Sequence, residues 1–163
     1  MPHLFGAKLR HLRRHTGLTQ ADLAEKLALA RQGHVSNLEM GRREPSVDLV
    51  IQVAELFGVP TDVLLRDTIP VDTLVPGAGM TCTLSLPRVH EFGENLRSLR
   101  KQAGMTQADL AVRLGLTTHV HISVLERGRK APSLELLLHS ADLFGVTTDD
   151  LLRSPARPDA EKR

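Results

Sequence analysis

Few residues in this sequence have the type and spacing that metal binding requires. His11 and His15 are four residues apart, so a helix would place both imidazoles on one face, a spacing that zinc can use. No glutamate follows the first histidine, and no third ligand is near. His119 and His121 are two residues apart, which is wrong for one face of a helix. We therefore expect no metal and no cofactor.

Residues for covalent or acid–base catalysis are not grouped either. Cys82 is the single cysteine, which excludes an internal disulfide and a four-thiolate zinc site. We find no glycine-rich phosphate loop, serine elbow or pair of catalytic carboxylates. Asp149 and Asp150 lie at an expected helix start, where their negative charges interact favourably with the helix dipole. We therefore expect no enzyme, and Cys82 is either an inert small residue or a redox-sensitive thiol.

Basic residues gather at four places, 8–14, 42–43, 97–101 and 127–130. The net charge of +2 alone says little about a partner. However, the clusters occupy matching positions in the two halves of the chain. Repeated clusters of this kind indicate contact with a phosphate backbone.

The sequence contains a duplicated segment. Residues 5–66 align without gaps onto residues 92–153, with more than half of the positions identical. Two copies with a long connection indicate duplication of a complete domain, not a solenoid. We expect a first domain at 1–66, a linker at 67–90, a second domain at 91–153 and a frayed polar tail at 154–163.

Apolar residues recur at helical spacing in each copy, and polar residues mark the helix starts. Thr19 has the character of an N-cap with Asp22 at the third helical position. Leucine dominates the apolar residues while tryptophan and tyrosine are absent, which suits helices better than sheets. The fold is therefore predicted to be all-α, with two tandem five-helix domains. The expected helices cover 5–16, 20–27, 32–39, 47–57 and 61–66, then 91–103, 107–114, 119–126, 134–144 and 148–153.

The connection between the copies contains prolines 70, 76 and 87 and glycines 77 and 79, as linkers often do. Residues 81–86 alternate polar and apolar side chains. An alternative interpretation is therefore a short strand that pairs with the same strand of a second chain.

Several spaced motifs occur in both copies: Thr-Gln-Ala-Asp-Leu-Ala, then Ser-x-x-Glu, then Gly-Arg-x-x-Pro-Ser, then an apolar helix ending in Phe-Gly-Val. This series resembles the Xre and phage-repressor (lambda-repressor-like) helix-turn-helix family. The resemblance covers both copies and fails only in the linker and the tail. It implies a sequence-specific, double-stranded DNA-binding transcriptional regulator, such as a repressor, with two helix-turn-helix domains in one chain.

The resemblance also implies roles for individual residues. Gln20 and Gln107 open the first helix of each helix-turn-helix unit and are expected to bind phosphate. The second helix of each unit is expected to read bases, and we call it the reading helix. The basic residues after each reading helix, and one histidine on each reading helix, are expected to contact phosphate as well. These residues are Arg42, Arg43, Arg129, Lys130, His34 and His121.

Base reading is expected from the exposed side of the second helix of each unit. In the first copy the candidates are Arg31, Gln32, Ser36 and Asn37, and in the second they are His119 and Ser123. Asparagine and glutamine can each bond adenine through two hydrogen bonds. The second copy has valine at 120 and 124, so we expect the first domain to discriminate bases more strongly.

A charged pair in each copy is expected to be structural. In the family, the glutamate that ends the reading helix pairs with an arginine on the first helix. The matching pairs are Arg13 with Glu39 and Arg100 with Glu126. A partly buried pair of this kind would hold the helices in register.

The rival prediction is a protein-interaction module, in which the second domain binds a partner or a second copy through residues 134–138 or the last helix. An antitoxin that binds a toxin is a variant of it. No stretch nears 18 apolar residues and the start lacks a signal-peptide pattern. We therefore expect a cytoplasmic protein with no membrane partner.

Overall fold

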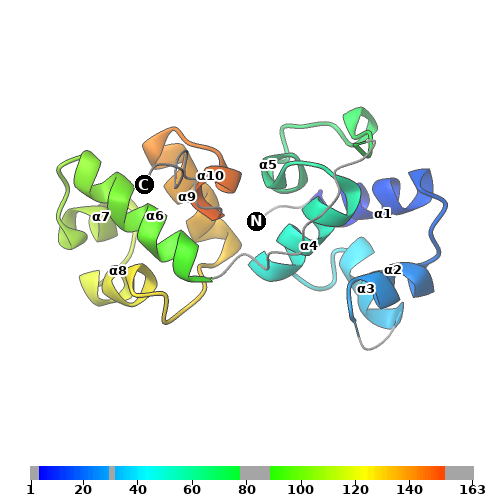
Figure 1. The fold of residues 1–163 in the computed structure, drawn as a ribbon, viewed down its shortest axis with the longest axis horizontal. Helices are drawn as coiled ribbons and strands as arrows, with labels where there is room; N and C mark the ends of the chain where they lie inside the picture. Colours follow the sequence, from blue (N-terminus) through cyan, green and yellow to red (C-terminus); the bar gives the residue numbers. More distant parts are fainter. Residues whose placement is uncertain (1–3, 30–31, 78–88, 153–163) are drawn as a thin grey trace, which may run out of the picture. The chain divides into compact units, whose positions relative to one another are not determined.

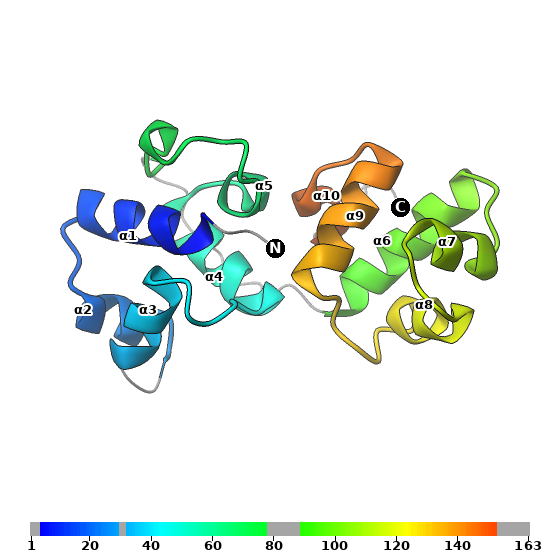
Figure 2. The same cartoon turned by 180° about the vertical axis from the view of Figure 1, so that it is seen from behind.

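The chain divides into two compact units, Met1–Ser85 and Leu86–Arg163. The computed structural model describes residues 4–29, 32–77 and 89–152, drawn in colour in Figures 1 and 2. Within these ranges the chain is helical and has no strand. No helix in the same ranges is long and apolar enough to cross a membrane. The possible strand at 81–86 lies outside the described residues.

In the part of the chain that the structure describes, each unit has five α-helices in the order expected from the sequence. The first unit has α1 Phe5–His15, α2 Gln20–Lys26, α3 Gln32–Glu39, α4 Val47–Phe57 and α5 Thr61–Leu65, followed by the short 3-10 helix η1 Val71–Thr73. The second has α6 Val89–Gln102, α7 Gln107–Arg113, α8 His119–Glu126, α9 Leu134–Phe144 and α10 Thr148–Leu152. The all-α prediction is confirmed, and α6 begins two residues earlier than expected.

The helix starts use the expected caps. The Thr19 hydroxyl accepts a hydrogen bond from the Asp22 amide at 3.1 Å, and the Asp22 carboxylate accepts one from the Thr19 amide at 2.8 Å. Thr106 and Asp109 repeat this capping box at the start of α7. The caps fix where α2 and α7 begin, and so where the helix-turn-helix of each unit starts.

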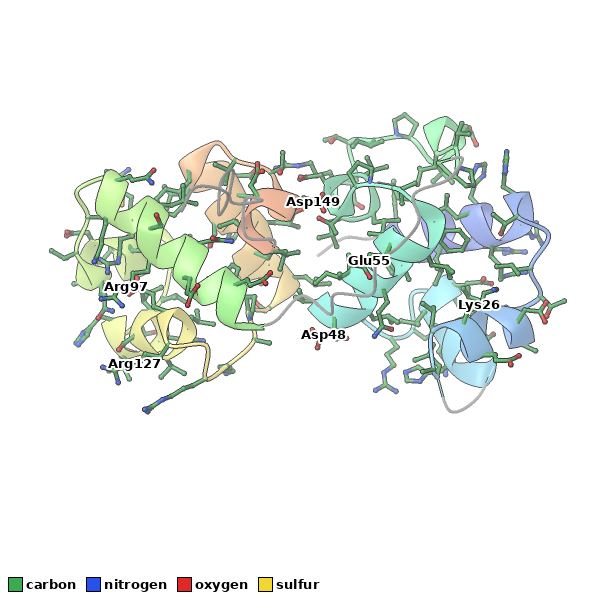
Figure 3. The ribbon with its side chains drawn as sticks, viewed as in Figure 1. Lys26, Asp48, Glu55, Arg97, Arg127 and Asp149 are labelled. Atoms are coloured by element: carbon green, nitrogen blue, oxygen red, sulfur yellow. The ribbon has the colours of Figure 1, made fainter. Side chains whose placement is uncertain are left out.

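A backbone contact sets how the first helix of each unit crosses the reading helix. A Cβ atom on Gly6 would lie only 2.3 Å from the Leu38 carbonyl oxygen, and one on Gly93 would lie 2.3 Å from the Leu125 carbonyl oxygen. Only glycine permits this approach. The contact brings α1 against the end of α3, and α6 against the end of α8. Charged side chains such as Lys26 and Asp48 stay on the outside (Figure 3).

Part of the expected linker packs on the first unit. Leu74 is 2% exposed, and its carbonyl oxygen lies 3.2 Å from Nε2 of His11 on α1. The Gly77 amide donates to the Phe57 carbonyl at the end of α4, at 3.0 Å. Residues 67–77 therefore extend the first domain beyond the boundary at 66, because an apolar side chain and backbone hydrogen bonds anchor them.

The basic cluster at 8–14 also needs correction, because Lys8 is buried. Its ammonium donates to the carbonyls of Val63 and Arg66 at the end of α5, at 2.7 and 2.6 Å. Burial lowers the pKa of Lys8, and the charge of Asp67 opposes that shift. The aligned residue Asn95 likewise donates to carbonyls at the end of α10. Lys8 therefore closes a helix end and cannot form part of a phosphate-binding surface.

The turn after α2 places a non-glycine residue in the left-handed region. Ala28 has φ of 50°, whereas its counterpart in the second unit is Gly115, with φ of 68°. We expect Ala28→Gly to raise the free energy of unfolding of the first domain by roughly 0.5–1 kcal/mol, because relief of the left-handed strain exceeds the added chain entropy. Urea unfolding followed by circular dichroism measures the change. Gly115→Ala is the matched reverse change and should destabilise the second domain; a loss of stability in Ala28→Gly would contradict the expectation.

Candidate nucleic-acid interface

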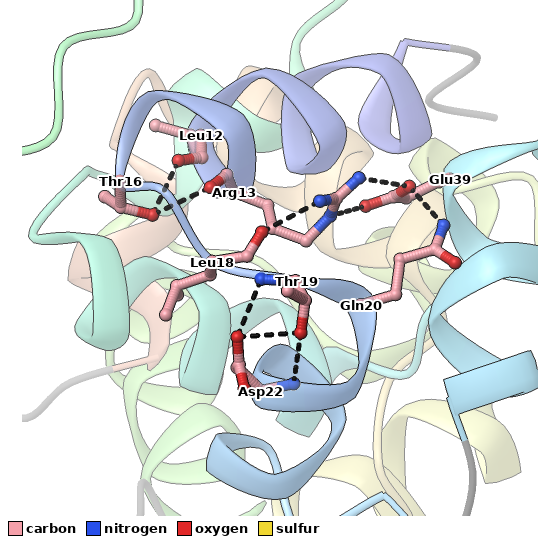
Figure 4. Close-up of polar contacts among 8 residues, drawn as sticks. All are labelled: Leu12, Arg13, Thr16, Leu18, Thr19, Gln20, Asp22 and Glu39. Carbon is pink, nitrogen blue, oxygen red and sulfur yellow. Dashed lines mark hydrogen bonds and ion pairs between the residues drawn. The ribbon is translucent and has the colours of Figure 1, made fainter.

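The candidate interface of the first unit is built around an ion pair. Arg13 on α1 meets Glu39 at the end of α3, with 2.5 Å between Nε and Oε1 and 3.2 Å between Nη2 and Oε2 (Figure 4). The two side chains are only 11% and 4% exposed. Arg13 also donates to the Leu18 carbonyl at 2.9 Å, in the turn before α2. One guanidinium thus joins α1, the turn before α2 and the end of α3.

The glutamine that opens α2 joins the same network. The Gln20 side-chain amide donates to Oε2 of Glu39 at 2.8 Å (Figure 4). This bond uses one of the two amide hydrogens of Gln20. The structure therefore places Gln20 at the junction of α2 and α3, and its phosphate contact stays a prediction.

The second unit repeats the network with nearly the same distances. Nε of Arg100 lies 2.5 Å from Oε1 of Glu126, and the Gln107 amide donates to Oε2 at 2.8 Å. Burial raises the pKa of the Glu126 carboxyl, but hydrogen bonds from Arg100 and Gln107 and the charges of Arg100 and Arg97 outweigh it and hold the pKa below its ordinary value. The glutamate therefore stays ionised, as a structural ion pair requires.

The residues of α3 that are expected to read bases lie on the side of the helix that is not packed in the core. Val35 and Leu38 are buried, Asn37 is exposed, and His34 and Ser36 are half-buried. Arg31 and the side chain of Gln32 lie outside the described residues. The amide of Asn37 is thus available to a partner, as a base-reading residue must be.

The reading helix of the second unit presents a less polar edge. His119 is exposed, and His121 and Ser123 are half-buried. Val120 is 56% exposed, and Val124, the counterpart of Asn37, is half-buried. The two reading helices therefore share a backbone course but differ in the chemistry they offer.

Basic side chains surround both reading helices. All four expected cations that follow these helices are exposed: Arg42, Arg43, Arg129 and Lys130. The structure adds Arg97 on α6 and Arg127 after α8, both exposed (Figure 3). Sequence reasoning placed these two in basic clusters without separating them from the internally paired Arg100, since charge alone does not tell which cations face solvent.

The histidines are not gathered around a common point. His11 and His15 have ring centroids 6.2 Å apart, and His11 is already close to the Leu74 carbonyl. Among the described residues, no three histidine, cysteine, aspartate or glutamate side chains form a group that could hold a metal ion.

The arrangement of each unit is that of a helix-turn-helix protein. A family model described as a helix-turn-helix domain matches residues 4–67 and again residues 91–154. These matches cover more than half of the chain, which therefore belongs to this helix-turn-helix family and carries two copies of its domain.

Curated relatives match over the length of about one domain. The SPbeta prophage-derived uncharacterized HTH-type transcriptional regulator YonR of Bacillus subtilis is 34% identical over 65 residues, which are 40% of this chain and 59% of that protein. The HTH-type transcriptional regulator DdrOP3 of Deinococcus deserti is 42% identical over 59 residues, 36% of this chain and 45% of that protein. The chain thus spans about half the length of these relatives.

A solved structure also matches over one domain. The restriction-modification controller protein C.AhdI from Aeromonas hydrophila is 32% identical, with 39% of this chain and 94% of that chain covered and a TM-score of 0.36.

The ion pair gives a test of the interface's framework. We expect Glu126→Gln to lower the free energy of unfolding of the second domain by about 3 kcal/mol, because Arg100 would keep a buried charge without its counter-ion. The double change Arg100→Met with Glu126→Leu should cost less than the single change. Urea unfolding by circular dichroism suits a chain that lacks tryptophan and tyrosine. Glu135→Gln, at an exposed site, is the control; equal stability of Glu126→Gln and this control would refute a structural role.

Proposed function

We propose that the chain is a sequence-specific double-stranded DNA-binding protein that acts as a transcriptional regulator in the cytoplasm. The observation that carries the proposal is the exposed polar edge of α3, held by the Arg13–Glu39–Gln20 network and followed by the exposed Arg42 and Arg43. A helix held in this way can enter the major groove while the preceding helix crosses the backbone. We propose no catalytic role.

The chemistry of each side chain decides whether it would contact a base or the DNA backbone. Asn37 has the donor and acceptor that pair with N7 and the N6 amino group of adenine. Arg42 and Arg43 would hold phosphates and so fix the position of the reading helix without reading sequence. His34 and Ser36 are half-buried, which suits backbone contact better than deep insertion into the groove.

The second domain would discriminate between bases less strongly than the first domain. Val124 stands where Asn37 stands in the first domain, and the exposed Val120 can offer only apolar contact, for instance to a thymine methyl. The first domain is therefore the main source of specificity.

Selection of bound duplexes from a random library, with the full chain, tests the proposal. We expect an enriched site, and we expect Asn37→Ala to weaken its discrimination by roughly 1–3 kcal/mol, because a bidentate adenine contact is lost. Val124→Ala is the matched control and should change discrimination little. Binding should fall by several powers of ten between low and moderate salt. No enrichment at low salt would rule out the function, and equal losses in the two variants would rule out the unequal roles.

A second candidate function, docking of a second copy of the chain, is favoured by a difference in burial between the units. Four apolar positions are buried in the first unit and only half-buried at equivalent places in the second. These are Leu12, Ile51, Phe57 and Val59, with the counterparts Leu99, Leu138, Phe144 and Val146, which we call the open face. Of the residues named before as a docking surface, 134–138, Leu138 belongs to the open face, whereas Leu134, Leu136 and Leu137 are buried in the core of the second unit.

The covering segment explains the difference. Residues 67–77 pack on the first unit through Leu74 and a hydrogen bond from Gly77 to Phe57. The described part of the second unit, which ends at residue 152, contains no counterpart of residues 67–77. A second copy supplies the missing apolar surface, because two identical open faces complement one another in a two-fold contact.

Sedimentation equilibrium tests this contact. We expect the mass of the wild-type chain to rise from 17.9 kDa toward twice that value with concentration, and Val146→Glu to abolish the rise because it buries a charge in the contact. Val112→Glu is the control, since Val112 is 77% exposed and outside the open face. A monomer at all concentrations, or equal effects of both variants, would refute the contact.

A further inference from the structure

The first unit contains a buried copy of the open face. Its four residues align with those of the open face, and we call them the covered face: Leu12, Ile51, Phe57 and Val59. Only Ile51 differs in type from its counterpart, which is Leu138. None of the four is more than 8% exposed, whereas their counterparts are half-buried. Because the side chains are nearly the same, the difference in exposure comes from what lies over them.

Residues 67–77 are held beside the covered face by contacts with α1 and with the end of α4. The carbonyl oxygen of Leu74 lies 3.2 Å from Nε2 of His11 on α1. At the end of α4, Gly77 packs so closely that a Cβ atom on it would lie 2.7 Å from the carbonyl oxygen of Gly58. An imidazole and a close glycine contact therefore hold the two parts of the segment in place.

The helices of the unit do not require this segment. The described part of the second unit forms the same five helices without a counterpart of it. The position of His11 is taken there by Ser98, whose hydroxyl accepts a hydrogen bond from Gln102 of the same helix at 3.3 Å. Within the segment Leu74 is buried, but the neighbouring Val75 is 67% exposed. The segment can therefore leave the covered face while the helical framework stays in place.

Two uncovered faces on one chain would change the kind of assembly that forms. A chain with one self-complementary face pairs with a second copy and stops at a dimer. A chain with two such faces can bind two neighbours at once, and repeated contacts of this kind form fibres unless they close into a ring. A segment that covers one of two matching faces therefore limits association to pairs.

We propose that residues 67–77 are an intramolecular cap, which prevents the covered face of the first unit from binding a second copy of the chain. When the cap is displaced, the covered face of one chain binds the same face of another. The proposal goes beyond DNA binding and rests on the docking of a second copy through the open face, proposed above. The cap restricts that docking to the second unit.

Sedimentation equilibrium of the full chain with Val146→Glu tests the covered face alone, because the added charge blocks the open face. We expect this variant to be a monomer of 17.9 kDa. Addition of Leu74→Ser, which removes the buried side chain of the cap, should make the mass rise with concentration toward twice that value. Addition of Gly77→Val should do the same, because its side chain would collide with the Gly58 carbonyl. With Val146 intact, the same changes should raise the mass above that of a dimer.

Two controls show whether the association uses the covered face. Val75→Ser alters the exposed neighbour of Leu74 and should leave the Val146→Glu variant monomeric. Val59→Glu, at the counterpart of Val146, should return the released variants to monomers, because it places a charge in the covered face.

Circular dichroism checks the helical content of every variant. Monomers in both released variants would overturn the proposal, as would association that Val59→Glu does not remove. Unfolding of the first domain in both released variants would make the segment part of the domain's framework and would also overturn it. Because the Val146→Glu background does not depend on the second unit, a monomeric wild type refutes the contact through the open face and not the cap.

Discussion

A nearly buried ion pair between the first helix and the end of the reading helix holds each domain together. In the first domain Arg13 reaches Glu39 and the carbonyl of Leu18, and Glu39 also accepts from Gln20. Three helices are thus tied through two charges that have little access to water. Because removal of either charge would strand the other, the arrangement resists gradual change. The reading edge of α3 can vary in sequence while its position stays fixed.

A comparison of the two domains distinguishes the residues that the fold requires from the residues that give each domain its own surface chemistry. Lys8 and Asn95 differ in charge, yet both donate to carbonyls at the end of a short helix, so the hydrogen bonds matter and the charge does not. Asn37 and Val124 differ on a frame that is otherwise the same, and so do Met40 and Arg127. Conserved geometry with altered surface chemistry is the pattern expected when two copies take different parts of one task.

Much of the fold could be read from the sequence because its signals are local. Helical spacing and the Thr19 and Asp22 cap depend on residues near in sequence, whereas the pairing of Glu39 with Arg13 was implied by the resemblance to a known family. The docking of residues 67–77 could not be predicted from the sequence, because the prolines there suggest a linker. The burial of Leu74 depends on a surface that exists only when α1 and α4 have packed together. Lys8, Arg13 and Arg10 look alike in sequence; only the tertiary structure decides which cation is inside, which is paired and which faces solvent.

The docking of residues 67–77 also shortens the tether between the domains. Between Gly77 and the start of α6 at Val89 the chain has only eleven residues, 78–88, and a chain of that length spans at most about 40 Å. An undocked connection from residue 67 would reach about twice as far. The shorter reach raises the effective concentration of one domain near the other once the first has bound. It also reduces how far apart two DNA sites bound by one chain can lie. Leu74, distant from any reading helix, thus limits which pairs of sites a single chain can occupy.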